Sequence, residues 1–535
     1  MAESSKRQKP EAFEEEMQDR ISSLPDGVLS HILSFLPTKT TVQTSILSNR
    51  WHHIWKHSSV LYFTEFTDEY YHRYADKRSE LFTSFVVMVN SVLNLLHNPR
   101  RIRKMTLICF FNHSKDKFRE YSVNNWIQSV IGPHLEELSL TLVKDRPGPD
   151  YFKLPQTLFT SPNLVSLSLV GLISLQKLSS TTVSLPSLKV LLIDIRCVEV
   201  SSVNALLSGC PIIETLNLSF HPISLDKVCA PPSLKRLTVD LNNGHAAYLE
   251  INAPDLEYLN ITGITFGEVF SMYNLHNVVE AHLDVFPHLF GSVTPLHNLL
   301  GALSGTKRLV LSTSTIKWLL GEPHDLLFQE FCYLVRLKLS LPRFNYNSLI
   351  SLLQKCPMLR VLIIDSVEEK EQSPVLRWAP HRSVPSCLVS HLKIVQFQGF
   401  QGLQDELLFV KYALRNGLVL EKMIVYDMSL DQKKKNNIIK ELSKSKSVPM
   451  PLVRMVCGAE FVSGHVTGVV TGEGVFVFCS GFGLDLFQGD CCVGEPLPFP
   501  SLLLFFSLAV FALACLADVF VLSASFPLYC LCIGL

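Results

Sequence analysis

Three histidines, His52, His53 and His57, are the group in this sequence that comes nearest to a metal site. They lie in a segment whose apolar residues repeat with a helical period, so polar helix surface is the simpler interpretation. The cysteines of Cys491-Cys492 and Cys530-x-Cys532 have no histidines at the spacing that zinc sites use. We therefore expect no metal ion in this protein.

Signatures of cofactor binding and of nucleophilic catalysis are missing as well. The sequence contains no Gly-x4-Gly-Lys-Ser/Thr phosphate loop and no Gly-x-Ser-x-Gly elbow. Gly481-Phe482-Gly483 lacks the strand–turn–helix context of a dinucleotide site. Cys210-Pro211 and Cys356-Pro357 share a Cys-Pro pair, but no second ligand recurs with it. We expect no cofactor and no catalysis by this chain, which leaves binding as the class of function.

Apolar residues between Leu24 and Trp55 are the best candidates for a binding surface. Pro25 suits the first turn of a helix, and the apolar rhythm of that helix stops at Pro37. After a turn at residues 38–41, a second helical rhythm continues to Trp55. The first helix is apolar over more of its circumference than a small core uses, which is typical of a binding face. The sequence alone does not divide core from binding face among the candidates, which are Leu24, Pro25, Leu29, Ile32, Leu33, Leu36, Leu47, Trp51 and Trp55.

This segment, residues 19–66, resembles an F-box. The resemblance lies in Leu24-Pro25-Asp26, in the run from Ile32 to Lys39, and in Leu47-Ser48-Asn49-Arg50-Trp51. With Asp19-Arg20-Ile21-Ser22 in front, it is similar to the plant proteins that join an F-box to leucine-rich repeats. The resemblance implies that the candidate residues bind a Skp-type adaptor, and through it a cullin, within a ubiquitin ligase. A self-contained helical cap and a DNA-binding three-helix unit are the alternatives.

A repeated phrase fills the chain from residue 102 onward. It consists of an apolar residue, two others, an apolar residue, one other and an apolar residue, and its starts lie 21 to 33 residues apart. That spacing is typical of leucine-rich repeats. The eleven phrases are Ile102-Met105-Leu107, Leu135-Leu138-Leu140, Leu164-Leu167-Leu169, Leu188-Leu191-Ile193, Ile213-Leu216-Leu218, Leu234-Leu237-Val239, Leu256-Leu259-Ile261, Val278-Ala281-Leu283, Thr306-Leu309-Leu311, Leu334-Leu337-Leu339 and Leu359-Leu362-Ile364.

Each phrase predicts one short strand, because alternate residues of a strand point to the same side. Stacked copies give a parallel sheet with a continuous core behind it. Two repeats, at residues 203–211 and 349–357, also carry a helical pattern that ends at Cys-Pro, which predicts a convex-side helix with the cysteine under its turn. The expected fold class is α/β: an N-terminal helical F-box followed by an irregular leucine-rich-repeat solenoid.

Residues 381–448 change in style and predict strand, helix, strand, helix. Gly399-Phe400-Gln401-Gly402 and Leu420-Glu421-Lys422-Met423 carry a resemblance to the FBD domain, which often follows an F-box and leucine-rich repeats. In physical terms we expect this segment to close the open edge of the sheet as a cap.

The tail from residue 449 departs from the family pattern. No Lys or Arg follows Arg454, glycines are frequent, and residues 501–517 form an unbroken apolar run. Ser501–Leu522 is only marginally long enough to cross a bilayer once Asp518 is counted, and it lacks basic flanks. A membrane anchor and a tail without an evolved role are the two interpretations. We expect the second.

Composition limits the class of partner. The 535 residues carry no net charge, so no overall field attracts nucleic acid. The first 20 residues are polar and do not read as a signal peptide, which favours a cytoplasmic or nuclear protein whose scattered cysteines are reduced and buried. We expect a substrate-recognition subunit of a ubiquitin ligase that binds an unknown target protein, or alternatively a scaffold outside any ligase. The expected division is 1–18 disordered tail, 19–66 F-box, 67–101 helical connector, 102–380 solenoid, 381–448 FBD-like cap and 449–535 tail outside the fold.

Overall fold

The computed structural model spans the chain, and the part of it that the structure describes is given by residue ranges. These are 21, 23–65, 78–96, 98–111, 117–144, 151–175, 178–222, 227–241, 246–287, 294–320, 329–341, 346–367, 383–427, 434, 437–438, 442, 452–457, 466–471 and 474–480. The apolar run at 501–522, the first 18 residues and most of the helix expected near residue 440 lie outside these ranges. Among the described residues, no helix has the length and apolarity that crossing a membrane requires.

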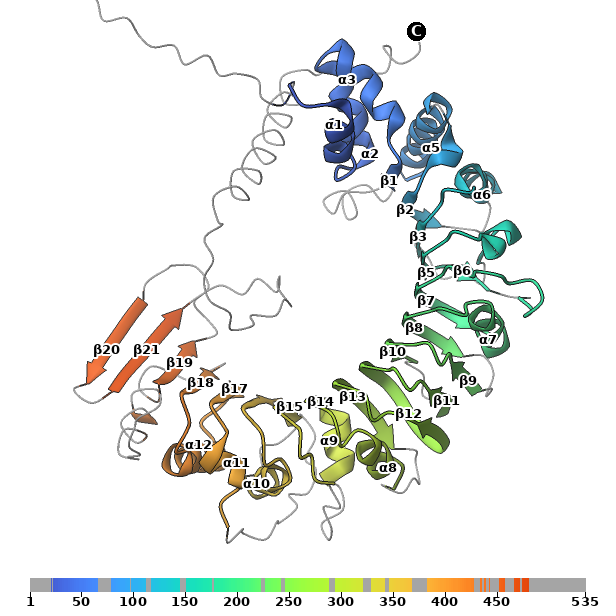
Figure 1. Cartoon of the computed structure of the whole chain (residues 1–535). Helices are drawn as coiled ribbons and strands as arrows, with labels where there is room; N and C mark the ends of the chain where they lie inside the picture. Colours follow the sequence, from blue (N-terminus) through green and yellow to red (C-terminus); the bar gives the residue numbers. More distant parts are fainter. Residues whose placement is uncertain are drawn as a thin grey trace, which may run out of the picture. The chain divides into compact units, whose positions relative to one another are not determined.

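A small helical unit begins the described chain (Figure 1). Pro37 precedes a helix and not a loop: residues 38–41, where we expected a turn, form the start of α2. Because proline lacks a backbone N–H, it fits just before or at the start of a helix as readily as in a turn. The elements of the unit are α1 (Asp26–Leu33), α2 (Thr38–Gln43), η1 (Thr44–Ile46), α3 (Asn49–Ile54) and η2 (Trp55–His57).

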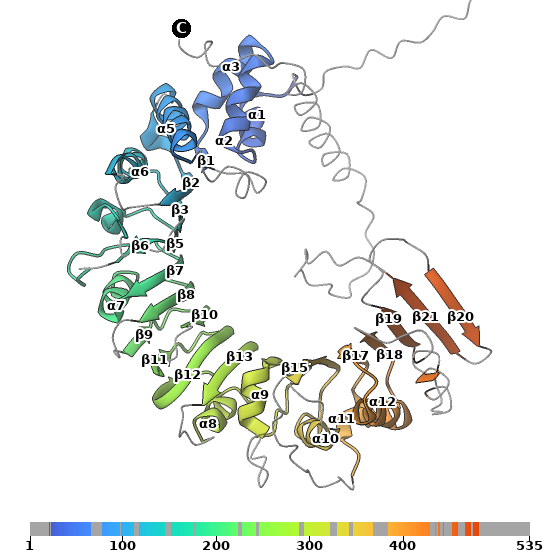
Figure 2. The ribbon, with the colours of Figure 1, turned by 180° about the vertical axis from the view of Figure 1, so that it is seen from behind.

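One parallel sheet then runs through the rest of the described chain, with helices on its convex side (Figures 1 and 2). Each strand of its main ladder pairs in parallel with the next, from β1 to β19. The ladder consists of β1 (Val60–Thr64), β2 (Lys104–Phe111), β3 (Glu137–Lys144), β5 (Ser166–Gly171), β7 (Val190–Val198), β8 (Thr215–Pro222), β10 (Arg236–Asp240), β12 (Tyr258–Tyr273), β13 (Glu280–Pro287), β14 (Arg308–Leu311), β15 (Arg336–Leu341), β16 (Val361–Ser366), β17 (Ile394–Phe400), β18 (Lys422–Asp427) and β19 (Leu452–Cys457).

The register of the ladder follows the repeated phrase. The middle residue of each phrase pairs with the middle residue of the next, as Leu216 does with Leu237 and Leu309 with Leu337. All three residues of all eleven phrases are buried. The leucine-rich-repeat fold expected from the sequence is thereby confirmed, and its core is the column of stacked phrase residues behind the sheet.

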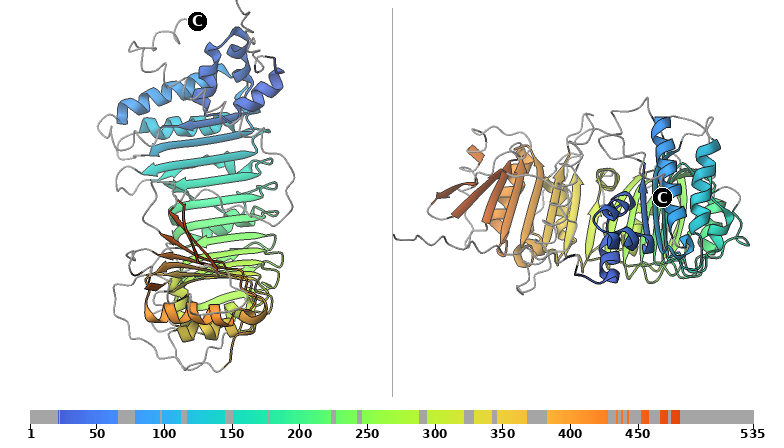
Figure 3. Two further views of the ribbon diagram at one scale, coloured as in Figure 1. Left: turned by 90° about the vertical axis from the view of Figure 1, so that its left-hand side faces the viewer. Right: turned by 90° about the horizontal axis from the view of Figure 1, so that it is seen from above.

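Helices complete the convex side, and Figure 3 shows the same ribbon from two further directions. The helices expected at 203–211 and 349–357 are present as α7 and α10, and Cys210 and Cys356 are buried at their ends. Burial raises the pKa of Cys210 to about 12, so this residue packs as a neutral thiol. The helices are α5 (Arg78–Leu95), η4 (Pro99–Arg101), α6 (Lys117–Val130), η5 (Gln156–Thr160), α7 (Val200–Ser208), α8 (Thr294–Ala302), α9 (Thr313–Leu320), α10 (Tyr346–Gln354), α11 (Ser386–Ser390) and α12 (Gln404–Asn416).

Three features differ from the expectation. The pair β9 (Lys227–Ala230) and β11 (Ala246–Asn252) adds strands between repeats, and β4 (Phe152–Lys153) pairs with β6 (Ile173–Ser174) in a separate two-stranded sheet. Cys229 and Cys332 are exposed, whereas Cys109, Cys210, Cys356 and Cys387 are buried as expected. All three features arise in connections between phrases, where the repeat does not dictate the sequence.

The sheet also continues past residue 448, where we expected the fold to end. Strand β19 pairs in parallel with β18, and Val453 is in register with Met423. Strand β21 (Gly474–Ser480) pairs with β19, and β20 (Val466–Thr471) pairs antiparallel with β21. Residues 452–457 thus belong to the sheet, because an edge strand offers unpaired backbone groups to any following segment able to extend.

Candidate functional site

The core of the N-terminal helical unit is built from one stripe on each helix. Leu29 and Leu33 lie one turn apart on α1 and are buried, and Trp51, Ile54 and Trp55 bury the facing side of α3 and η2. Residues four apart share a helix face, which explains the pairing of Leu29 with Leu33. The Thr41 hydroxyl donates to the Leu33 carbonyl oxygen over 3.2 Å and fixes α2 against the end of α1.

Large apolar side chains that this core does not use remain exposed. Phe35 is 75% exposed, Ile46 is 86% exposed and Leu47 is 58% exposed. Val28 and Ile21, near the start of the unit, are also exposed. A small soluble domain seldom exposes five large apolar residues within some 30 positions. Such a surface marks an interaction site.

The structure divides the nine candidate residues of this unit into three groups by burial. Leu29, Leu33, Trp51 and Trp55 are buried, Leu24, Ile32 and Leu36 are half-buried, and Pro25 and Leu47 are exposed. Sequence reasoning left Val28, Phe35 and Ile46 off the candidate set. The signal for two of them was present, because Val28, Ile32 and Phe35 follow a second helical stripe that starts on α1 and continues into the turn after it.

An arginine holds the extended start of the unit against α3. The Arg50 Nη2 atom lies 2.6 Å from Asp26 Oδ1 and also donates to the Leu24 carbonyl oxygen. Both charged side chains are partly exposed, so the ion pair contributes at most about 1 kcal/mol of stability. Its effect is to fix the position of the Leu24–Asp26 segment before any partner binds.

Strand β1 connects this helical unit to the sheet. The backbone N–H of Tyr62 donates to the Thr38 hydroxyl over 2.7 Å, which ties β1 to the start of α2. On its other edge β1 pairs with β2, and Leu61 is in register with Met105 of the first phrase. Strand β1, which follows the helical unit directly, is therefore also the first strand of the solenoid.

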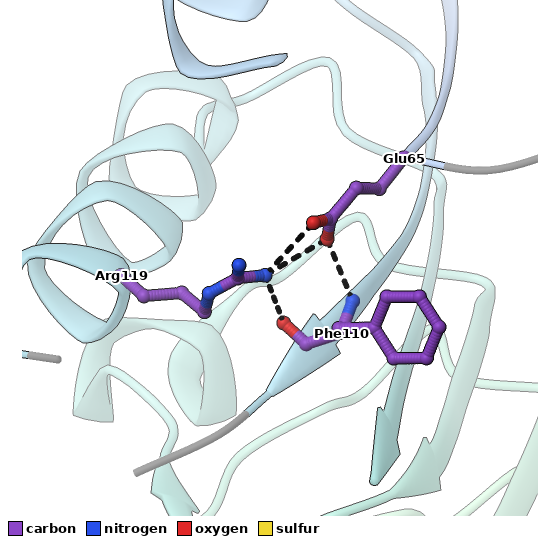
Figure 4. A network of polar contacts seen from close by, with 3 residues as sticks. All are labelled: Glu65, Phe110 and Arg119. Atoms are coloured by element: carbon purple, nitrogen blue, oxygen red, sulfur yellow. Dashed lines mark hydrogen bonds and ion pairs between the residues drawn. The ribbon is translucent and has the colours of Figure 1, made fainter. Parts of the chain in front are cut away.

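A buried ion pair closes this junction (Figure 4). Glu65 follows β1 directly, and its carboxylate lies 2.9 Å from Arg119 Nη1 on α6. The Phe110 N–H donates to Glu65 Oε2 over 2.8 Å, and Arg119 Nη1 donates to the Phe110 carbonyl oxygen over 2.7 Å. The Arg119 guanidinium also lies 3.5 Å from the centre of the Phe82 ring on α5. Four elements of the chain, β1, β2, α5 and α6, thus meet at one arginine.

The outward face of the sheet is a second candidate surface. Along each strand, the residues between the buried phrase positions belong to the opposite face of the sheet, because successive side chains alternate. The strands line the concave side of the ribbon in Figure 1. Ion pairs link neighbouring repeats at many of these positions, for example Lys104 with Glu137 at 2.7 Å and Lys393 with Glu421 at 2.6 Å.

The described residues contain no group of three or more His, Cys, Asp or Glu side chains that could hold a metal ion. His52, His53 and His57 are all exposed on the helical unit. The thiols at helix ends are buried and neutral, so in this part of the chain they offer no nucleophile.

Comparison with known protein families assigns both parts of the described chain. The family model of the F-box domain matches residues 21–63, and the model described as At1g61320/AtMIF1, LRR domain, matches residues 95–461. In Arabidopsis thaliana, the F-box/FBD/LRR-repeat protein At4g26340 is 33% identical over 441 residues, covering 81% of this chain and 97% of the relative. The F-box/LRR-repeat protein At3g59200 is 29% identical over 489 residues, covering 83% of this chain and 89% of the relative.

Proposed function

Because this chain belongs to the plant family of F-box/FBD/LRR-repeat proteins, we propose that it is the substrate-recognition subunit of a Skp–cullin–F-box ubiquitin ligase. In this proposal the F-box at residues 19–66 binds a Skp-type adaptor, and through it a cullin. The solenoid at 102–380, with the FBD-like segment at 381–448, binds a target protein. The proposed role is non-catalytic.

The mechanism is proximity. A receptor that holds the target near a charged ubiquitin-conjugating enzyme raises the effective concentration of the reacting groups, and no residue of the receptor has to do chemistry. A rigid connection between the two binding parts increases this effect, because a flexible connection spreads the target over unproductive positions. The pairing of β1 with β2 and the buried Glu65–Arg119 pair support such a rigid connection.

The observation that carries the adaptor proposal is the set of exposed apolar residues on the F-box. We assign the adaptor contact to Phe35, Ile46 and Leu47, with Pro25 and the half-buried Leu24 at the start of the unit. The buried candidates support this contact only indirectly, by holding the helices in place. Apolar side chains near the centre of an interface usually contribute most of its binding energy.

Co-purification of the full-length chain with a plant Skp-type adaptor tests the proposal. We expect wild-type protein to retain the adaptor at equimolar amounts, and Phe35→Ala with Ile46→Ala to reduce retention strongly. The matched control is Val87→Ala, which truncates another exposed apolar residue, 59% exposed, on α5 outside the F-box. Failure of wild-type protein to bind any Skp-type adaptor would mean a scaffold role outside the ligase.

The proposed location of the protein is the cytoplasm or the nucleus, where such ligases act. Attachment to a membrane through Ser501–Leu522 is the alternative, and that segment lies outside the described residues. Alkaline carbonate washing of membranes separates the two, since only an inserted chain stays in the pellet.

A further inference from the structure

On the outward face of strands β10 to β14, polar and aromatic side chains contact one another in a chain from Arg236 to Arg308. The Arg236 guanidinium stacks over the Tyr258 ring at 4.1 Å, and that ring contacts the His282 ring edge-on. His282 Nε2 lies 2.8 Å from one Glu280 oxygen, and Arg308 Nε lies 2.7 Å from the other. Each cation here has an internal partner.

This pattern ends at β15. Arg336 and Lys338 both point outward from this strand, and within the described part of the chain no hydrogen bond or ion pair engages either side chain. The lateral neighbours of Arg336 in the register are Arg308 and Val361, and those of Lys338 are Val310 and Ile363. A like charge on one side and apolar residues on the others leave these two cations without a carboxylate partner among the described residues.

Near the start of several other strands, cations are paired with glutamates, so the missing partners of Arg336 and Lys338 stand out. Arg103 pairs with Glu136, and Lys189 and Lys235 both pair with Glu214. At β15 the nearby cations Lys307 and Arg360 add to the positive charge, whereas Asp284 is engaged by Ser312 and Ser314. Like charges directly opposite each other in a sheet are destabilising, and an external anion would relieve this.

We propose that Arg336 and Lys338 form the contact point for an extended acidic segment of the target protein, with carboxylates two residues apart. The two cations are separated by one residue on a strand, which places them about 7 Å apart, and alternate residues of an extended peptide have the same spacing. Arg336 can bind a carboxylate through two parallel N–H donors. The neighbouring half-buried Val310 and Val361 lower the local polarity, which strengthens such charge-assisted contacts.

A protein segment fits this surface better than a nucleic acid does. Phosphate backbones require a long stripe of cations, because each neutralised phosphate contributes separately to affinity. Here the positive group is confined to strands β14 to β16, Glu280 lies on the flanking strand β13, Asp365 lies near the end of β16 itself, and the whole chain has no net charge. Two or three carboxylates suffice to neutralise it.

The experiment measures peptide binding to the full-length chain by fluorescence anisotropy. The probe is fluorescein-labelled Gly-Ser-Glu-Val-Glu-Val-Glu-Ser-Gly, and the paired probe has Gln at each Glu position. We expect the Glu peptide to bind at least about tenfold more tightly at low salt and to lose this preference at high salt. Arg336→Ala with Lys338→Ala should abolish the preference.

The matched control is Lys189→Ala with Lys235→Ala, which removes the same charge from cations that already have Glu214 as a partner. We expect it to change affinity by less than about twofold. Equal binding of the Glu and Gln peptides, or an equal loss in the control variant, would overturn the proposal. So would a twenty-nucleotide oligothymidine that binds as tightly as the Glu peptide and loses affinity in the Arg336/Lys338 variant.

This inference rests on the proposed role of the repeats in holding a target, and adaptor co-purification from the same preparations keeps the two apart. Peptide preference without adaptor binding would retain the acidic-segment site and remove the ligase role. Adaptor binding without peptide preference would retain the ligase role and remove the acidic-segment site.

Discussion

The carboxylate of Glu65 and the guanidinium of Arg119 form an ion pair with 2.9 Å between the nearest oxygen and nitrogen, and their side chains are only 3% and 6% exposed. The residues are 54 positions apart, at the end of the F-box strand and on α6. A buried pair of this kind specifies one arrangement of its elements, because every other arrangement leaves a charge buried without a partner.

Removal of one partner should therefore be costly. We expect Arg119→Met to lower the free energy of unfolding by about 3–5 kcal/mol, since Glu65 would remain buried and charged. Urea denaturation followed by circular dichroism measures this. Arg103→Met is the matched control, because Arg103 also pairs with a glutamate, Glu136, at 2.7 and 3.0 Å but is exposed, so its loss should cost much less. Similar losses in the two variants would mean that burial of the Glu65–Arg119 pair has no energetic consequence.

The exposed and buried residues of the F-box should respond differently to truncation. We expect Phe35→Ala with Ile46→Ala to weaken adaptor binding by about 2 kcal/mol or more while leaving the melting temperature within about 2 °C, because neither side chain is in the core. Leu29→Ala should instead destabilise the F-box by about 2–5 kcal/mol. Leu24→Ala with Pro25→Ala should abolish adaptor pull-down and leave the repeats folded. Isothermal titration and thermal melts separate the effects, and an unchanged affinity for both double variants would place the adaptor elsewhere.

The register of the solenoid can be tested with neighbouring residues. Leu216→Ala and Leu337→Ala should each cost about 2–5 kcal/mol, since both side chains are fully buried phrase positions. Lys235→Ala and Lys338→Ala should cost well under 1 kcal/mol, because both side chains contact solvent. Thermal unfolding of the four variants provides the comparison. Lysine variants as damaged as the leucine variants would contradict the observed alternation of faces.

A buried glutamate predicts a pH dependence. Glu406 Oε2 accepts the Gln401 N–H over 3.0 Å and the Leu403 N–H over 2.9 Å at the start of α12. Burial nevertheless raises its pKa above the ordinary value of 4.5. The folded state then binds the proton more tightly than the unfolded state, so the contribution of this group to stability falls as the pH rises from 4.5 through the folded-state pKa.

Two substitutions separate the charge of Glu406 from its hydrogen bonds. Glu406→Gln keeps an acceptor and should remove this part of the pH dependence, with a change below about 1 kcal/mol at neutral pH. Glu406→Ala leaves buried N–H groups without an acceptor and should cost about 1–3 kcal/mol. Urea midpoints between pH 4 and pH 8 report both effects, and a steeper fall with pH in the Gln variant than in wild type would reverse the assigned sign.

The repeats could be predicted from sequence because one constraint acts on every copy. Each phrase must bury the same three positions, so Leu188-Leu191-Ile193 and Leu334-Leu337-Leu339 show the same spacing although they lie far apart in the chain. The connections carry no such constraint. Strands β9 and β11 and the exposed thiols of Cys229 and Cys332 were therefore not foreseen.

The F-box surface was harder to predict for a physical reason. Leu29 and Phe35 are both large and apolar and lie on or next to the same helix, yet one is fully buried and the other is 75% exposed. Only the position of α3 decides which stripe is covered, and helical periodicity does not give that position. The Glu65–Arg119 pair could not be predicted for a similar reason, since the sequence around these two charged residues does not distinguish them from the many exposed ones.

Because β1 pairs with β2, the number of repeats sets the distance between the F-box and any later strand of the solenoid. Ten successive strand pairings separate β1 of the F-box from β15, where Arg336 and Lys338 lie. At about 4.8 Å per pairing, the contour between them is about 48 Å. Gain or loss of a single repeat would shift the target by one such increment and rotate it by the strand twist. If the proposed ligase role holds, the number of repeats sets which lysines of a bound target come within reach of the ubiquitin-charged enzyme, so repeat number is a quantity on which selection can act.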